Sequence, residues 1–233
     1  MSAHTPQKTL LHFIFLGIIT GEIIGVVWLP TFELIFKPLI MVWVGVYFYL
    51  STKRYSSEST GLMLAAFFFS WMGDILLMFQ TDKEPVIFIA GLASFLIAHT
   101  CYIRAFYMSV VKEEGKSILL KKPIYTVLIV LYGCLLYYIL FPNLNLVLKV
   151  AVFIYALALV LMALTALNRY QKVRTESFNF VFIGALLFVI SDSCIAINKF
   201  LFPFKQAHLL VMLTYMGAQY MIMRGVILQV WKS

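Results

Sequence analysis

The sequence contains few charged residues and few cysteines. Only 12% of its 233 residues are charged and three are cysteine, whereas 63% are hydrophobic. Soluble domains carry roughly 25% charged residues, and a soluble fold of this length could not hide so much apolar surface from water. This composition excludes a soluble globular protein. It also excludes a disordered chain, because disorder requires low hydrophobicity.

Sequence signatures of metal and cofactor sites are absent as well. The cysteines Cys101, Cys134 and Cys194 lie within apolar segments, at spacings that fit neither a zinc nor a haem site. There is no HExxH pair, phosphate-binding loop, dinucleotide fingerprint or G-x-S-x-G elbow. We therefore expect no metal and no organic cofactor.

A basic domain is also missing, although the net charge is +8. The basic residues fall in short connections between apolar runs, where membrane topology and anionic lipids explain them. We expect no nucleic-acid partner.

Long apolar runs dominate what is present. A helix needs about 20 apolar residues to cross a bilayer, and the first run is too long for the core of a cleavable signal peptide. We predict an all-α, polytopic membrane bundle in a single integral domain, 1–233. Its eight predicted spans are Leu10–Leu29, Glu33–Leu50, Thr60–Gln80, Pro85–Ser109, Pro123–Phe141, Leu146–Leu167, Ser177–Ile197 and Gln206–Val230.

The basic residues between these spans orient the bundle. With the N-terminus inside, basic side chains gather in the inner segments, and only Lys83, Lys199 and Lys205 fall in outer loops. Cytoplasmic loops carry an excess of Lys and Arg. We therefore expect both termini in the cytoplasm, in the inner membrane of a bacterium. The oligomeric state stays open.

Two aspartates lie deep within predicted spans. At 1.5 Å per residue, Asp74 lies ~21 Å and Asp192 ~22 Å from the inner ends of their helices. A charge at a helix centre costs about 2.5–3.5 kcal/mol on insertion scales, so an intramembrane carboxyl suggests a functional site. The alternative is that each aspartate only hydrogen-bonds a neighbouring helix. Lys37 and Lys149 are separated along the chain by nearly the same number of residues as Asp74 and Asp192. This similar spacing suggests two parallel four-helix repeats, although chance could also produce it.

Other polar side chains within or beside the spans are candidates for substrate binding. Lys37 and Lys149 could bind a lipid phosphate or counter the carboxyls, or could extend to the membrane surface as many lysines do. Glu22 follows a glycine-rich helix face. The remaining candidates for lining a cavity are His99, Tyr102, Ser191, Asn198, Lys199, Tyr215 and Gln219.

Several short motifs resemble the YhhN-like lysoplasmalogenase family. They are Gly73–Leu77, Gly91–Tyr102 and Gly184–Ser193, together with Lys37-Pro38, Tyr215 and Ala218-Gln219. Each motif is short, but their order and spacing are more specific. The resemblance covers about Lys37 to Gln219, and it implies a polytopic membrane enzyme that hydrolyses the vinyl ether bond of lysoplasmalogens to a fatty aldehyde.

The chemistry of that reaction suits a pair of carboxyls. A general acid delivers a proton to the alkene, and a carboxylate stabilises the resulting cation and activates water, as in glycosidases. We expect Asp74 as the acid and Asp192 as the carboxylate, stabilised by Ser191 and Ser193. The alternatives are a proton- or cation-coupled transporter that uses the same carboxyls, and a non-catalytic lipid-binding scaffold.

Overall fold

A computed structural model describes residues 6–55, 57–80, 85–111 and 117–230. Its long helices are α1 (Pro6–Val27), α2 (Pro30–Thr52), α3 (Glu58–Met78), α4 (Pro85–Met108), α6 (Pro123–Leu140), α7 (Leu146–Leu167), α8 (Thr175–Phe200) and α9 (Ala207–Val230). Short helical turns are η1 (Lys53–Tyr55), α5 (Ile118–Lys121) and η2 (Phe141–Asn143). All eight long helices are long and apolar enough to cross a membrane, which confirms the predicted polytopic all-α bundle.

The helix bounds differ from the predicted ones by a few residues at most ends. Pro30, which lies between the first two predicted spans, occupies the first turn of α2. Proline fits there because the first helical amides have no partner in the helix. The short helix α5 lies within the stretch that was predicted as a simple break.

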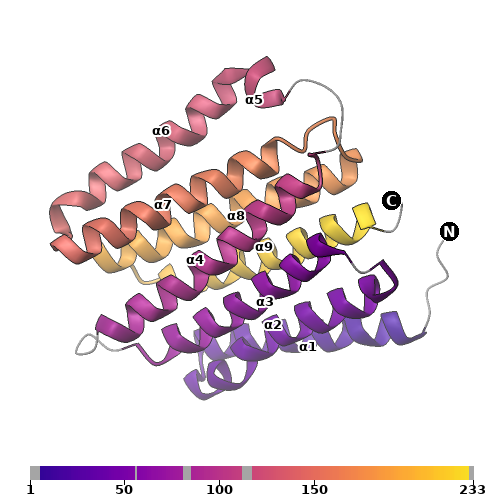
Figure 1. Cartoon of the computed structure of the whole chain (residues 1–233). Helices are drawn as coiled ribbons and strands as arrows, with labels where there is room; N and C mark the ends of the chain where they lie inside the picture. Colours follow the sequence, from indigo (N-terminus) through magenta and orange to yellow (C-terminus); the bar gives the residue numbers. More distant parts are fainter. Residues whose placement is uncertain (1–5, 56, 81–84, 112–116, 231–233) are drawn as a thin grey trace.

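The long helices run alternately up and down (Figure 1). The chain enters α1 and leaves α9 at one end of the bundle, which we call the terminal end; the other is the distal end. Helix α6 lies along one outer edge of the bundle and α1 along another. Leu140 is the only buried residue of α6, so this helix turns nearly all of its surface outward.

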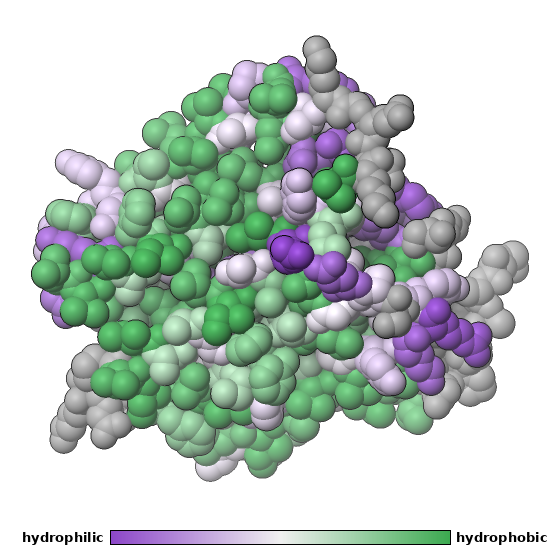
Figure 2. Space-filling model, viewed as in Figure 1, coloured by the Kyte–Doolittle hydropathy of each residue, from purple (hydrophilic) through white to green (hydrophobic). Residues whose placement is uncertain are grey.

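Much of the surface of the bundle is apolar. Large hydrophobic side chains such as Phe13, Leu131 and Leu157 are exposed, and hydrophobic residues cover most of the visible face, with polar ones gathered mainly at the terminal end (Figure 2). Such a surface is stable in lipid, where tails are the solvent. The chain is therefore an integral membrane protein.

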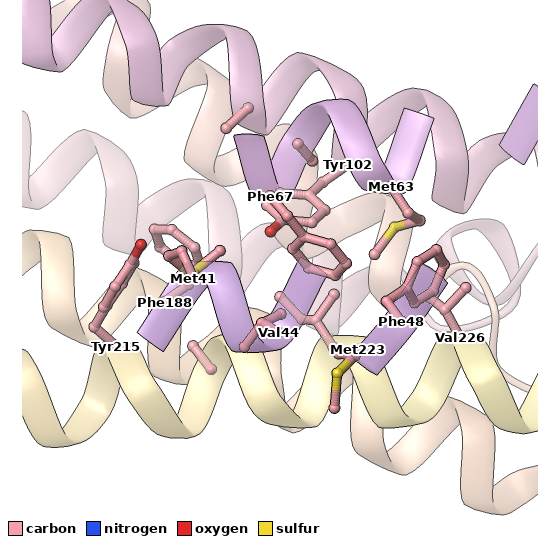
Figure 3. Packing of buried hydrophobic residues seen from close by; sticks show 14 of the residues in the cluster. Met41, Val44, Phe48, Met63, Phe67, Tyr102, Phe188, Tyr215, Met223 and Val226 are labelled. Atoms are coloured by element: carbon pink, nitrogen blue, oxygen red, sulfur yellow. The ribbon is translucent and has the colours of Figure 1, made fainter. Parts of the chain in front are cut away.

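The main core joins α2, α3, α4, α8 and α9. In Figure 3, Met41, Val44 and Phe48 of α2 face Phe67 of α3 and Met223 of α9, and all of them belong to one buried cluster. Glycines bring the paired helices close together. A Cβ at Gly73 would lie 2.5 Å from the Phe95 ring, and one at Gly184 would lie 2.9 Å from the carbonyl oxygen of Ala218.

A buried arginine ties the terminal end of the bundle together. Arg169, just after α7, is fully buried and donates hydrogen bonds to Ser109 Oγ (3.2 Å), Ser177 Oγ (2.8 Å) and Gln229 Oε1 (2.8 Å). Burial lowers the pKa of its guanidinium to about 9, because removal from water disfavours the charged form. These bonds connect the ends of α4, α8 and α9 to the α7–α8 connection.

Candidate active site

Asp192 on α8 lies beside one polar side chain of α7, Tyr155, and one of α4, His99. It is 9% exposed, and its Oδ2 accepts a hydrogen bond of 2.6 Å from the hydroxyl of Tyr155 on α7. Nε2 of the fully buried His99 lies 3.8 Å from the same oxygen, which is too far for a hydrogen bond.

Asp74 is hydrogen-bonded to a different tyrosine. Its Oδ2 accepts a hydrogen bond of 2.7 Å from Tyr215 on α9, and both side chains are buried. At 1.5 Å per residue, Asp74 and Asp192 lie about 24 and 26 Å from the terminal ends of their helices. The predicted match in depth therefore agrees with the helix bounds.

A second buried network lies one helical turn from Asp74. Tyr102 of α4 donates to Gln219 Oε1 at 2.6 Å, and Gln219 Nε2 donates to Ser70 Oγ at 3.1 Å. Ser70 precedes Asp74 by four residues on α3, so both side chains lie on one helix face. The network therefore positions α3, α4 and α9 around Asp74.

Aromatic rings lie between the residues that surround the two carboxyl groups. Phe188 packs against His99 (ring centroids 4.8 Å apart) and against Tyr215 (5.6 Å), and Figure 3 shows Phe188 beside Tyr215. Phe95 also contacts both Phe188 and Tyr215. Each aspartate is hydrogen-bonded to a different tyrosine.

Asp192 lines an apolar cavity. The cavity has a volume of about 50 Å³, and Asp192 is the only charged residue among those that line it. Tyr155 supplies the neighbouring hydroxyl. The other lining residues are apolar and come from α3, α4, α7 and α8: Leu77, Phe88, Leu92, Phe95, Val152, Ile195, Ala196 and Phe200. Its walls therefore suit apolar ligand atoms, with Asp192 and Tyr155 as the polar groups that such atoms would meet.

Charged side chains gather near the distal end of α1, α2 and α9. Glu33 accepts from His208 Nε2 at 3.0 Å and from Lys37 Nζ at 3.4 Å. The charge of Lys37 also acts on Glu22 and on Asp74. Glu22 is fully buried, and its carboxyl oxygens have no hydrogen-bond partner among the described residues. Glu33, Lys37 and His208 thus form a charged cluster that is separate from the contacts of Asp192.

Some predicted site residues have other roles. Ser191 and Ser193 do not stabilise Asp192 as predicted, because their hydroxyls donate to the carbonyls of Val211 (3.2 Å) and Val189 (2.6 Å). Asn198 Oδ1 accepts from the amide of Phe204 and so fixes the α8–α9 connection.

Two predicted lysines lie away from the carboxyls. Lys149 Nζ sits 4.0 Å from the centre of the Phe141 ring. Lys199 Nζ lies 4.5 Å from the centre of the Phe88 ring and 3.5 Å from Gln80 Oε1. Phe88 lines the cavity, so Lys199 is near its rim, whereas Lys149 lies beside the α6–α7 connection.

Sequence reasoning missed Tyr155, the closest partner of Asp192. A tyrosine in an apolar span is common, and only its depth relative to Asp192 could have suggested a contact. Glu33 and His208 were missed because each stands near a helix end, where charged residues are ordinary. In the part of the chain that the structure describes, no three His, Cys, Asp or Glu side chains converge as metal ligands.

Comparison with known proteins decides the family. The sequence profile of the YhhN family matches residues 32–226. The chain belongs to the YhhN family. Its resemblance to that family, expected from the motifs around Asp74 and Asp192, is thus confirmed.

The relatives of this YhhN chain carry enzyme names. It is 30% identical over 195 residues to lysoplasmalogenase TMEM86A of Bos taurus, covering 79% of this chain and 73% of that one. It is 33% identical over 168 residues to lysoplasmalogenase TMEM86B of Sus scrofa, covering 72% and 62%. No solved structure matches this YhhN chain. The family match includes both aspartates and both tyrosines, whereas Glu22 lies before its first residue.

Proposed function

We propose that this protein is a membrane-embedded hydrolase that cleaves the vinyl ether bond of a lysoplasmalogen or a related lysophospholipid and releases a fatty aldehyde. The names of the relatives support the reaction class. The observation that carries the proposal is the pair of buried carboxyls, each bonded to a tyrosine hydroxyl, with one facing an apolar cavity.

The reaction starts with Asp74 as the acid. Its carboxyl proton passes to the alkene carbon remote from the ether oxygen, and the π electrons form the new C–H bond. The adjacent carbon becomes an oxocarbenium ion. A water molecule attacks that carbon while the Asp192 carboxylate takes its proton, which gives a hemiacetal. General acid and base groups of this kind contribute typically 10²–10⁴-fold each to a rate.

The second half of the reaction restores both carboxyls. Asp192 gives its proton to the leaving glycerol oxygen as the C–O bond breaks, and Asp74 takes the proton of the hemiacetal hydroxyl. The products are a fatty aldehyde and a glycerophospho-base. The tyrosine hydroxyls hold the carboxylate oxygens in place, because a buried charge without a donor is costly.

The surroundings of the carboxyls suit a lysophospholipid. The alkyl tail would enter the cavity beside Asp192, the vinyl ether bond would lie between Asp192 and Asp74, and the phosphate would lie toward Lys37. Glu22 and Glu33 would then lie near a cationic head group. His99, Tyr102 and Gln219 would shape the space between the carboxyls and orient water.

Aldehyde release from lysoplasmalogen by the purified protein tests this proposal. We expect Asp74→Asn and Asp192→Asn each to lower the turnover rate by about 10²–10⁴-fold, with unchanged helix content. Glu58→Gln is the matched control, because Glu58 is a carboxyl on α3 that forms an exposed ion pair with Arg104. Full activity in both asparagine variants would overturn the catalytic assignment. Ion flux in proteoliposomes without turnover would favour the transporter alternative.

A further inference from the structure

A second cavity lies at the terminal end of the bundle, far from the carboxyls. It has a volume of about 350 Å³ and lies between α5, α6, α7 and α8. Phe178 and Phe182 line it from α8, and Asp192 follows on the same helix about 15–21 Å farther along, at 1.5 Å per residue. The cavity is therefore a separate site.

The lining of this cavity changes from polar to apolar along α6, from Lys122 toward Ile129. Lys122, Tyr125 and Tyr170 are exposed. The remaining lining residues are apolar: Ile118, Leu128, Ile129, Leu167, Phe178 and Phe182. Leu128 and Ile129 lie about 9–10 Å farther along α6 than Lys122, at 1.5 Å per residue. A cation at the mouth and hydrocarbon below it match a phospholipid, with its phosphate above an acyl chain.

The charge at the mouth favours an anionic occupant. Lys121 and Lys122 are both exposed, and none of the lining residues is acidic. Among the described residues, neither lysine side chain has an ion-pair partner. A lysine near the membrane surface attracts anionic lipid by about 1 kcal/mol. The same pair of lysines would repel a second copy of this chain.

The packing of α6 leaves room for an apolar occupant in this cavity. A separate small cluster, built on Ile118, Leu167 and Phe178, borders the cavity, and α6 buries only Leu140 at its other end. An apolar cavity offers a water molecule no hydrogen bonds. An acyl chain from the surrounding bilayer would instead restore the missing contacts between α6 and its neighbours.

We propose that this cavity binds one acyl chain of an anionic glycerophospholipid, whose phosphate contacts Lys122. The lipid stabilises the terminal end of α6 against α7 and α8. This site is independent of the proposed hydrolase activity, because it shares no residue with the cavity beside Asp192.

Thermal unfolding of the full chain in neutral detergent, with added phosphatidylglycerol or phosphatidylcholine, tests the site. We expect phosphatidylglycerol to raise Tm more than phosphatidylcholine does. Native mass spectrometry should detect one retained molecule of phosphatidylglycerol per chain. Lys122→Gln should weaken phosphatidylglycerol binding about fivefold, the loss of one lysine–lipid attraction. Lys53→Gln is the matched control, since Lys53 is exposed at the same end and does not line the cavity.

A larger side chain in the lining tests whether the cavity holds an acyl chain. Ile129→Trp should fill the cavity and abolish retention of the lipid. If the Ile129→Trp variant does not fold, Leu128→Phe is the replacement variant for the same measurement. Asp192→Asn should bind the lipid like the unaltered protein. Equal stabilisation by both lipids, equal behaviour of the Lys122 and Lys53 variants, or full retention in a folded cavity-filling variant would each overturn the proposal.

Discussion

At the scale of single residues, the tyrosine partners of the carboxyls are the most informative contacts. Tyr155 donates to Asp192. We expect Tyr155→Phe to lower kcat about 10–100-fold, because the loss of a hydrogen bond to a charged group costs about 1.5–3 kcal/mol. The measurement is steady-state aldehyde release, and KM should change much less than kcat.

Tyr132→Phe is the control for that variant. Tyr132 of α6 also donates its hydroxyl to α8, to Ser193 Oγ at 2.8 Å, but it does not contact Asp192. Its removal should cost stability and leave kcat within about twofold of the unaltered protein, because it touches no group of the proposed reaction. If both variants lost kcat equally, the role of Tyr155 would be structural.

At the scale of helices, close glycine contacts hold the pairs α3–α4 and α8–α9 together. A Cβ at Gly184 would meet the backbone of α9 at the carbonyl oxygen of Ala218 and the amide of Ile222. Backbone cannot move aside as a side chain can. We therefore expect Gly184→Ala to lower the free energy of unfolding by about 1–3 kcal/mol, the usual cost of overpacking.

Gly61→Ala provides the comparison at this scale. Gly61 lies in α3, and no atom outside its own helix lies within 4 Å of an added Cβ. Alanine is the better helix former by roughly 0.8–1.0 kcal/mol, so this variant should be as stable as the unaltered protein or more so. Thermal unfolding in detergent measures both. A Gly184 variant as stable as the Gly61 variant would contradict the close approach of α8 and α9.

At the scale of the whole molecule, Arg169 connects helix ends that are distant in sequence. Lysine lacks the planar fork that reaches several acceptors at once. Arg169→Lys should leave part of the Ser109, Ser177 and Gln229 network without its donor, and should destabilise the protein by about 2–4 kcal/mol. The free energy of unfolding in denaturant measures this effect. Activity at low temperature should remain, because Arg169 is far from both aspartates.

Orientation in the membrane is the second prediction at this scale. The terminal end of the bundle holds most of the basic connections, including Lys53, Lys121 and Lys172. By the positive-inside rule this end should face the cytoplasm. Reporter fusions that distinguish the two sides should place both termini inside and the loop that contains Lys83 outside. An external terminus would contradict the orientation.

The eight spans and the depth of the two aspartates were predictable from the sequence. Lipid accepts only apolar runs long enough to cross it, and helical rise converts position along the chain into depth. The charge bias between loops likewise follows from the order of residues alone. These are one-dimensional properties, and the helix bounds match them to within a few residues at most ends.

Only the tertiary structure decided which side chains meet. Ser191 and Ser193 stand beside Asp192 in the sequence, but a helical neighbour points to another face, and their hydroxyls bond to backbone carbonyls. Tyr155 reaches Asp192 because of how α7 is rotated and packed against α8. The separation of the carboxyls by Phe188 and Phe95 likewise depends on contacts between helices, which no local pattern encodes.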